Sequence, residues 1–178
     1  QTICYSTTPD SLSFSDLPSG SSGEGDYEYQ WQISTDMDTW SDIELSTGTT
    51  YSPEVLYETT YYRVRVSSLY GCGVAFTPPL TINVYDELLP GNITEIDTIC
   101  YATPPDLILS ETDALGGNLQ YTYQWYATSD TTSWGIIPGA TSLSYQPGIL
   151  TETTYYELRY TSGEGCGTVT SNISEVYV

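Results

Sequence analysis

The sequence contains no histidine and no lysine, and all three of its basic residues are arginines. Histidine is the commonest general base and a common zinc ligand, so its absence disfavours catalytic triads and most transition-metal sites. With 23 acidic residues against three arginines, the formal charge is −20. A polyanion of this kind is repelled by nucleic-acid phosphates and by anionic lipid, so we expect neither nucleic acid nor a membrane surface as a partner.

The sequence also lacks any apolar run approaching the roughly 18 residues that span a bilayer, so no membrane insertion is expected. What it has in quantity is aromatic: 18 Tyr and 4 Trp in 178 residues, within a hydrophobic fraction of 39%. This composition is typical of a folded protein and differs from that of an acidic disordered tail. We therefore expect tyrosine and tryptophan to supply much of the core.

An internal repeat divides the sequence into two units. Segments that match at an offset of 94 residues are Tyr27-Glu-Tyr-Gln-Trp31 with Tyr121-Thr-Tyr-Gln-Trp125, Glu58-Thr-Thr-Tyr-Tyr62 with Glu152-Thr-Thr-Tyr-Tyr156, and Gly71-Cys-Gly73 with Gly165-Cys-Gly167. Near the start the offset becomes 96, where Cys4 matches Cys100. So many matches in register indicate two homologous domains, which we place at residues 1–88 and 89–178.

Domain 2 has several residues ahead of its Thr-Ile-Cys segment, whereas domain 1 begins almost at that segment. We therefore expect the first strand of domain 1 to be truncated and the chain to come from a longer tandem array. The two domains meet in a short connector that contains proline and glycine, as domain boundaries commonly do.

Strand signals dominate both units, and no segment shows an apolar period typical of a helix. Trp31 and Trp125 each sit in a strand that alternates aromatic and polar residues, and Tyr62 and Tyr156 begin a second alternating strand about 30 residues later. These four residues are the predicted core. The pattern predicts an all-β chain of two tandem immunoglobulin-like antiparallel β-sandwich domains, with the Trp strand as strand C and the Tyr strand as strand F.

Each unit has one cysteine near its start and one in a Gly-Cys-Gly turn. Four cysteines allow three pairings, and the repeat favours Cys4–Cys72 together with Cys100–Cys166. The alternative is two reduced, buried cysteines in each unit, although a cysteine flanked by glycines in a turn is seldom part of a core. Disulfides would indicate an oxidising, extracytoplasmic compartment.

These motifs together resemble a known repeat. They are Ile-Cys-Tyr, Tyr-x-Tyr-Gln-Trp, Trp-x-x-Ile, Pro-Gly-Ala-Thr at 138–141, Tyr-x-Pro, Leu-x-Glu-Thr-Thr-Tyr-Tyr and a cysteine before the last strand. The chain is similar to the Ig-like/PKD-like tandem repeats of large Bacteroidetes cell-surface adhesins, including gliding-motility-associated proteins exported by type IX secretion. Domain 1 departs from the pattern at residues 46–49, where the Pro-Gly-Ala-Thr turn is replaced.

The resemblance implies a secreted protein at the extracellular cell surface, whose neighbours are further Ig-like repeats of the same longer chain. It implies a non-catalytic spacer that holds distal binding regions away from the cell, and it carries over no catalytic residues. The composition agrees, since no pair of carboxylates is singled out for glycoside hydrolysis and no Ser or Thr has a His or Lys to activate it. We expect no enzymatic activity and no cofactor other than calcium.

Two acidic clusters are candidate calcium ligands, because Ca²⁺ takes six to eight oxygen ligands. The clusters are Asp36, Asp38 and Asp42 in domain 1, and Asp86, Glu87 and Asp97 around the connector. The alternative is a solvated acidic surface that keeps a long protein soluble without any ion.

Aromatic residues on the outer side of the predicted C and F strands are a candidate glycan-binding face: Tyr61, Tyr126, Tyr155 and the neighbouring Arg159. Surface glycans would then be partners, through stacking of sugar rings on the phenols. The alternative is ordinary cross-strand pairing of tyrosine with arginine or glutamine, which stabilises an exposed sheet face. We expect the arginines to pair with neighbouring acids such as Glu28.

Overall fold

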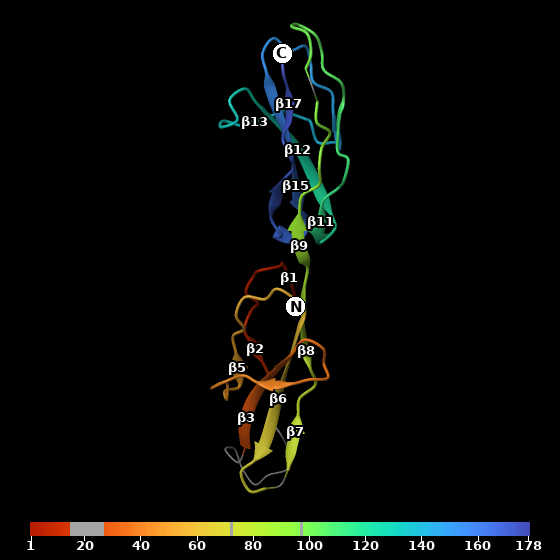
Figure 1. The fold of residues 1–178 in the computed structure, drawn as a ribbon. Helices are drawn as coiled ribbons and strands as arrows, with labels where there is room; N and C mark the ends of the chain where they lie inside the picture. The colour runs from red at the N-terminus through yellow and green to blue at the C-terminus, as the bar shows by residue number, and fades with distance from the viewer. Residues whose placement is uncertain (15–26, 72, 97) are drawn as a thin grey trace. The chain divides into compact units, whose positions relative to one another are not determined.

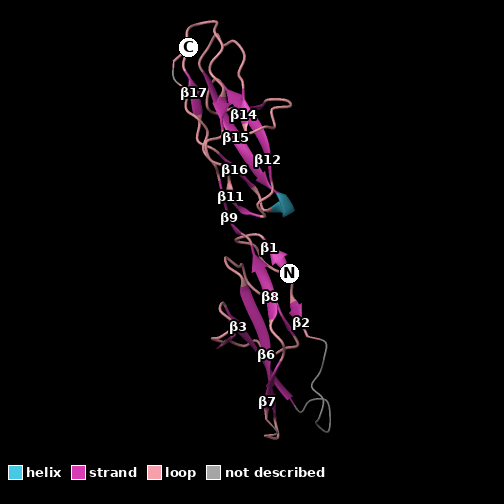
Figure 2. Cartoon of the chain, turned by 90° about the vertical axis from the view of Figure 1, so that its right-hand side faces the viewer, coloured by secondary structure: helices cyan, strands magenta, loops and turns pink. Residues whose placement is uncertain are grey.

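The computed structural model describes residues 1–14, 27–71, 73–96 and 98–178. They form two compact units, Gln1–Asp86 and Glu87–Val178, which meet two residues before the predicted boundary. Both units consist of strands and loops, and the single helical element of the described residues is a 3₁₀ turn at Gly163–Gly165 (Figure 2). No helix in this described part is long and apolar enough to cross a bilayer.

The described residues of unit 1 form two sheets. Its strands are β1 (Thr2–Ile3), β2 (Leu12–Ser13), β3 (Tyr27–Ser34), β4 (Ser41–Asp42), β5 (Thr50–Tyr51), β6 (Thr60–Ser68), β7 (Val74–Phe76) and β8 (Leu80–Val84). The larger sheet has the order β1-β8-β6-β3-β4, with β7 also paired to β6, and the smaller sheet pairs β2 with β5. Strands β3, β6 and β7 lie side by side in Figure 1.

Unit 2 repeats this plan. Its strands are β9 (Asp86–Leu89), β10 (Ile108–Leu109), β11 (Leu115–Gly117), β12 (Tyr121–Thr128), β13 (Gly135–Ile136), β14 (Ser144–Tyr145), β15 (Thr154–Ser162), β16 (Thr168–Thr170) and β17 (Ser174–Val176). The larger sheet has the order β13-β12-β15-β16, with β17 also paired to β15. The β10–β14 pair corresponds to β2–β5, and β9 pairs with β11.

The centre of each unit is one long antiparallel pair, β3 with β6 and β12 with β15. Trp31 lies opposite Val64 in the first pair, and Trp125 lies opposite Leu158 in the second. A short strand at the start of unit 1, β1, runs parallel to β8 at the sheet edge. The predicted fold class, all-β with two immunoglobulin-like sandwich units, is confirmed.

The last strand of each unit is interrupted, and a hydroxyl group fills the gap in the ladder. Between β7 and β8, Thr77 accepts the Val64 N–H on its Oγ1 at 2.9 Å and donates its own N–H to the Val64 carbonyl. Between β16 and β17, Ser171 does the same for Leu158. A Thr or Ser side chain can take the place of a backbone acceptor, so the break leaves no buried N–H without a partner.

The core of each unit is built on a triad of aromatic rings. In unit 1 the ring centroids of Trp31 and Tyr51 are 5.8 Å apart, and those of Tyr51 and Tyr62 are 5.7 Å apart. Trp125, Tyr145 and Tyr156 give the same two distances in unit 2. Aromatic pairs at such separations stabilise a core beyond the area that they bury.

Burial has a chemical consequence for the third member of each triad. Tyr62 and Tyr156 are almost wholly buried. Burial, and secondarily the neighbouring tyrosine of the triad, raises the pKa of both phenols to about 12. Both side chains therefore stay protonated and neutral in the folded unit under ordinary conditions.

Unit 2 contains a glycine that no other residue can replace without a shift of the backbone. A Cβ on Gly91 would overlap the Thr112 carbonyl oxygen and would lie 2.8 Å from both the Asp113 carbonyl carbon and the Tyr160 hydroxyl. We predict that Gly91→Ala lowers the free energy of unfolding by about 1–3 kcal/mol, the usual cost of overpacking. Gly148→Ala is the matched control, because nothing lies within 4 Å of its Cβ position.

Chemical denaturation of the two variants and the parent chain measures the difference. Equal midpoints for Gly91→Ala and Gly148→Ala would show that the approach of the two segments at Gly91 is looser than the structure has it.

Candidate functional site

The candidate ligand face is the outward side of the central strand pair, which we call the C–F face. In unit 1 it consists of the outward residues of β3 and β6 together with Asp42 of β4. Gln32 lies opposite Arg63 in the β3–β6 ladder and opposite Asp42 in the β3–β4 ladder, so these three side chains meet.

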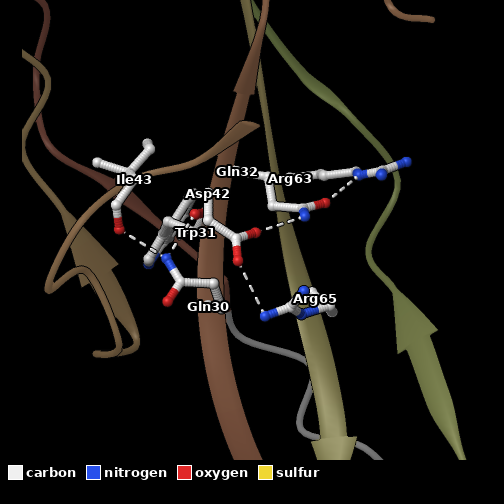
Figure 3. A network of polar contacts seen from close by, with 7 residues as sticks. All are labelled: Gln30, Trp31, Gln32, Asp42, Ile43, Arg63 and Arg65. Atoms are coloured by element: carbon white, nitrogen blue, oxygen red, sulfur yellow. Dashed lines mark hydrogen bonds and ion pairs between the residues drawn. The ribbon is translucent and has the colours of Figure 1, made fainter. Parts of the chain in front are cut away.

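A chain of polar contacts runs across the C–F face of unit 1 (Figure 3). Arg63 Nε donates to Gln32 Oε1 at 2.8 Å, and Gln32 Nε2 donates to Asp42 Oδ1 at 2.7 Å. Arg65 Nη2 donates to the other carboxylate oxygen of Asp42 at 3.1 Å. Arg65 and Asp42 form an ion pair whose side chains are 37% and 46% exposed, so solvent screens it and its contribution to stability is small.

The guanidinium of Arg63 also lies between two aromatic rings. Its Cζ is 4.2 Å from the centroid of the Trp40 ring and 4.2 Å from that of the Phe76 ring. Cation–π contacts at exposed sites contribute about 0.5–1 kcal/mol each. One face of each ring is thus in contact with a side chain of the same unit.

The C–F face of unit 2 places two of the predicted ligand residues in contact with one another. The Arg159 guanidinium lies 3.8 Å from the centroid of the Tyr126 ring, and its Nε donates to Glu157 Oε1 at 2.7 Å. Glu157 is only 6% exposed, so this charge-assisted bond compensates the burial of a carboxylate. Arg65 and Arg159 therefore pair with neighbouring acids, as expected, although the acids are Asp42 and Glu157 and not Glu28. Arg63 binds Gln32 instead.

The two remaining predicted face residues, Tyr61 and Tyr155, occupy equivalent positions near the start of β6 and β15 and are half-buried. Tyr155 lies opposite Glu175 across the β15–β17 ladder. Partial burial first, and then a hydrogen bond to the Glu175 carboxylate, raises the pKa of the Tyr155 phenol. Tyr155 therefore pairs with a residue of the adjacent strand, as in ordinary cross-strand pairing.

The C–F face of unit 1 also carries an open hollow of about 480 Å³. Its lining residues are Tyr27, Glu28, Tyr29, Gln30, Thr47, Arg65 and Ser67. The counterparts of five of them in unit 2 are identical, namely Tyr121, Tyr123, Gln124, Thr141 and Arg159. The hollow contains none of the four predicted ligand residues.

Gln30 and Gln124 have a role that alternation alone did not indicate. Gln30 Nε2 donates to the carbonyl of Trp31 at 2.9 Å and to that of Ile43 at 2.6 Å. Gln124 Nε2 makes the equivalent bonds to Trp125 and Ile137 at 3.0 and 2.7 Å. The strand pattern assigns both glutamines to the solvent side, but their repetition directly before each tryptophan was a signal for a shared structural contact.

The first predicted calcium ligand, Asp36, closes a turn. Its Oδ1 accepts the N–H groups of Asp38 and Thr39 at 2.8 and 2.7 Å and the Ser34 hydroxyl at 2.9 Å. These donors, the Thr39 and Asp38 N–H first, lower the pKa of the Asp36 carboxyl to about 2. The Asp36 carboxylate therefore accepts its hydrogen bonds from donors of its own turn.

The same turn occurs in unit 2, where Asp130 accepts bonds from Thr128, Thr132 and Ser133. These donors, the Ser133 and Thr132 N–H first, also lower the pKa of Asp130. Both aspartates therefore close a turn in the same way. Only unit 1 has further acidic residues beside that turn.

The carboxylates of Asp36, Asp38 and Asp42 are not gathered into one site, which favours the alternative of a solvated acidic surface. Asp36 closes its turn and Asp42 binds Gln32 and Arg65, so their carboxylates are used separately. Among the described residues no three acidic or cysteine side chains are grouped so that they could hold a metal ion. Of the second predicted cluster, Asp97 lies outside the described residues, and Asp86 and Glu87 are exposed.

The cysteines depart from the predicted pairing. Cys166 is disulfide-bonded, but Cys100 is an exposed free thiol, so the predicted Cys100–Cys166 bridge is wrong. Cys4 is also disulfide-bonded. The predicted Cys4–Cys72 pair is wrong as well, because the chain has four cysteines and Cys166 would have no partner if Cys4 were bonded to Cys72 while Cys100 is free. The equivalence of the two units fixed which cysteines correspond, but it carried no information about which turns come close.

Comparison with known proteins gives a family and distant structural likenesses. A family model described as "Domain of unknown function (DUF8696)" matches residues 1–86 and again residues 89–178. Two solved structures align with the whole chain: Sidekick-1 immunoglobulin domains 1–4, at 16% identity and a TM-score of 0.43, and Sidekick-1 immunoglobulin domains 1–5, at 17% and 0.42. The chain spans 44% and 35% of these structures, and no curated protein matches it.

The use of Asp36 and Asp42 predicts how the protein responds to calcium. We expect the same melting temperature in millimolar CaCl₂ and in MgCl₂ at matched ionic strength, because both ions only screen a charge of −20. A site that binds calcium in the folded state would instead raise stability by about 2.7 kcal/mol at a hundredfold excess over its dissociation constant. A rise that is specific to calcium and is abolished in Asp36→Asn would contradict this account.

Proposed function

We propose that this chain, which belongs to the DUF8696 family over both of its units, is a pair of non-catalytic structural repeats in a longer cell-surface adhesin. In this role each unit is a folded spacer, and binding is done by other regions of the longer protein. The immunoglobulin-like fold supports a structural or adhesion-type module. The extracellular location, the bacterial adhesin context and the neighbouring repeats are parts of this proposal.

The observation that carries the proposal is the contrast between the interior and the C–F face. The centre of the interior is repeated: the two aromatic triads have the same centroid distances to within 0.1 Å. The contact of each glutamine with its neighbouring carbonyls is also repeated. What both units retain is therefore the set of contacts that makes a stable sandwich.

The polar network on the C–F face is not retained. Three of its four members, Gln32, Asp42 and Arg63, correspond at the same offset to Tyr126, Ile136 and Glu157, and only Arg65 is retained, as Arg159. A binding site shared by both units would need the same groups in the same places. In each unit the charged groups of this face are paired with different residues. This supports a surface that keeps the unit stable and soluble without a ligand common to both units.

The charge supports the same role. A formal charge of −20 keeps chains apart by repulsion, and this suits a long surface protein that must not associate with its copies. The disulfide-bonded state of Cys4 and Cys166 supports an oxidising compartment, such as the cell exterior.

The second candidate function is glycan binding, and one observation favours it. Five residues that line the hollow of about 480 Å³ in unit 1 are identical in unit 2, including two tyrosines and an arginine. Their identity has another explanation, however, because Tyr27 and Tyr29 pack against the core and Gln30 holds the neighbouring loop. We therefore prefer the spacer.

Substitution of the tyrosines on the face distinguishes the two functions. We predict that the parent chain does not bind above background to a panel of immobilised glycans. Tyr126→Ala and Tyr155→Ala should give the same result as the parent chain. Arg65→Gln, in the lining of the hollow, serves as a third variant that addresses the alternative site. Specific glycan binding by the parent chain, lost in any of the three variants while the melting temperature is kept, would replace the spacer with a lectin-like module.

A further inference from the structure

Unit 2 has an open hollow of about 460 Å³ away from its C–F face, which we call the unit 2 hollow. Its lining residues are Glu95, Ile96, Ile173, Glu175 and Tyr177. None of the ligand residues predicted from the sequence is among them. The hollow thus combines two carboxylates with apolar and aromatic side chains at a place that the sequence did not single out.

Alternation along β17 and its flanking residues brings three of these side chains to one side. Ser174 and Val176 are 0% exposed. Ile173 and Tyr177 are 45% and 58% exposed, and Glu175 between them is exposed as well. Successive side chains of a strand point to opposite faces of a sheet. The hollow therefore lies on the outer side of β17, where its apolar groups and the carboxylate are accessible to a partner.

The second carboxylate comes from the first segment of unit 2, which crosses from one sheet to the other. Ile93 bridges to Ser110 beside the smaller sheet, and Thr98 bridges to Tyr177 beside the larger sheet. Glu95 lies between these two bridges and is exposed. The two carboxylates of the hollow therefore come from segments that are far apart in the sequence and adjacent in the fold.

Within the part of the chain that the structure describes, no cation neutralises either carboxylate. The two ion pairs of this part both lie on the C–F faces, at Arg65 and Arg159. The sequence has no lysine and one further arginine, Arg63, which binds Gln32. The Tyr155 hydroxyl donates a hydrogen bond to the Glu175 carboxylate, and this bond leaves the carboxylate further lone pairs to accept from a ligand.

The fold does not require the groups that line this hollow. At the offset of 94 residues, Glu175 and Tyr177 correspond to Thr81 and Asn83 of unit 1. Unit 1 has the same central strand pair and the same aromatic triad without them. The acidic and aromatic groups at this edge are therefore specific to unit 2, and binding of a ligand gives them a use that folding does not.

An arginine side chain is complementary to this set of groups. A guanidinium forms paired hydrogen bonds with a carboxylate, and it stacks on an aromatic ring such as that of Tyr177. Its aliphatic stem packs on apolar surface, here Ile96 and Ile173. A lysine ammonium cannot form the paired bonds, so arginine fits better. The formal charge of −20 also attracts a basic partner before contact is made.

We propose that the unit 2 hollow docks an arginine side chain from a basic segment of another protein. A second copy of this chain is not the occupant, because its arginines are already bonded on their own faces. The inference goes beyond the spacer role, since it gives unit 2 a contact that unit 1 does not share. Because the hollow is open, the partner surface around the arginine completes the contact.

The experiment uses the whole 178-residue chain, labelled with ¹⁵N, and the end-blocked peptide Gly-Gly-Arg-Gly-Gly as the probe. NMR spectra are recorded during the titration in about 0.15 M NaCl, which screens non-specific attraction. The control peptide has citrulline in place of arginine, so it keeps the shape of the side chain without its charge. We expect the amide signals of residues 95–96 and 173–177 to shift with the arginine peptide and not with the control peptide.

Three variants assign the interaction to the two carboxylates. Glu95→Gln and Glu175→Gln should each raise the dissociation constant of the arginine peptide about fivefold, the effect of losing one exposed ion pair. Glu44→Gln removes the same charge from an exposed position of unit 1 and should leave the constant unchanged. All three replaced side chains are exposed, so the variants should keep the melting temperature of the parent.

The proposal is overturned if the arginine peptide shifts no signals of the hollow, or if the three variants weaken its binding equally. It is also overturned if the citrulline peptide or MgCl₂ gives the same shifts, because the hollow would then not recognise a guanidinium. All of these outcomes leave the spacer role to the glycan experiment, so the two proposals fail separately.

Discussion

The structure of each unit depends on how one buried tryptophan is held. The Trp31 indole Nε1 donates to the Gly48 carbonyl at 2.9 Å, and the Trp125 indole donates to the Ser142 carbonyl at 2.8 Å. Both side chains are 0% exposed, so an indole N–H without this partner would cost about 1–3 kcal/mol. The same bond fixes the loop that follows strand β4 or β13, and the glutamine before each tryptophan fixes the start of that loop. One side chain therefore sets both the core and the loop that covers it.

A unit held together from the inside leaves its outer surface free to change. In unit 1 the C–F face is satisfied by a glutamine, an aspartate and two arginines, and in unit 2 it is satisfied by a tyrosine, a glutamate and one arginine. Both solutions use cross-strand neighbours, which contribute only modestly to stability. Repeats that keep their core while their surfaces diverge are what a structural array needs, since each unit has to fold but none has to bind the same ligand.

The sequence predicted the fold because the alternation of aromatic and polar residues survives in both copies. Trp31 and Tyr62 follow directly from the period of two, since a strand with one buried face must alternate. The pairing of side chains was not predictable in the same way. Asp42 meets Gln32 only through the register of β3 with β4, which no local pattern encodes, and this is why Glu28 was the wrong partner for an arginine. The wrong prediction for Cys100 has a similar reason. A repeat identifies equivalent cysteines, but it gives no distance between the turns that contain them.

Hydrogen exchange of the four tryptophan indoles, followed by NMR, tests the central role of the anchored tryptophan most directly. Trp40 and Trp134 are half-buried and serve as internal controls for the buried pair. The account predicts that the Nε1 protons of Trp31 and Trp125 exchange only when the whole unit unfolds, as slowly as the slowest strand amides. Exchange of these two protons at the rate of the half-buried indoles, with the strand amides still protected, would contradict it.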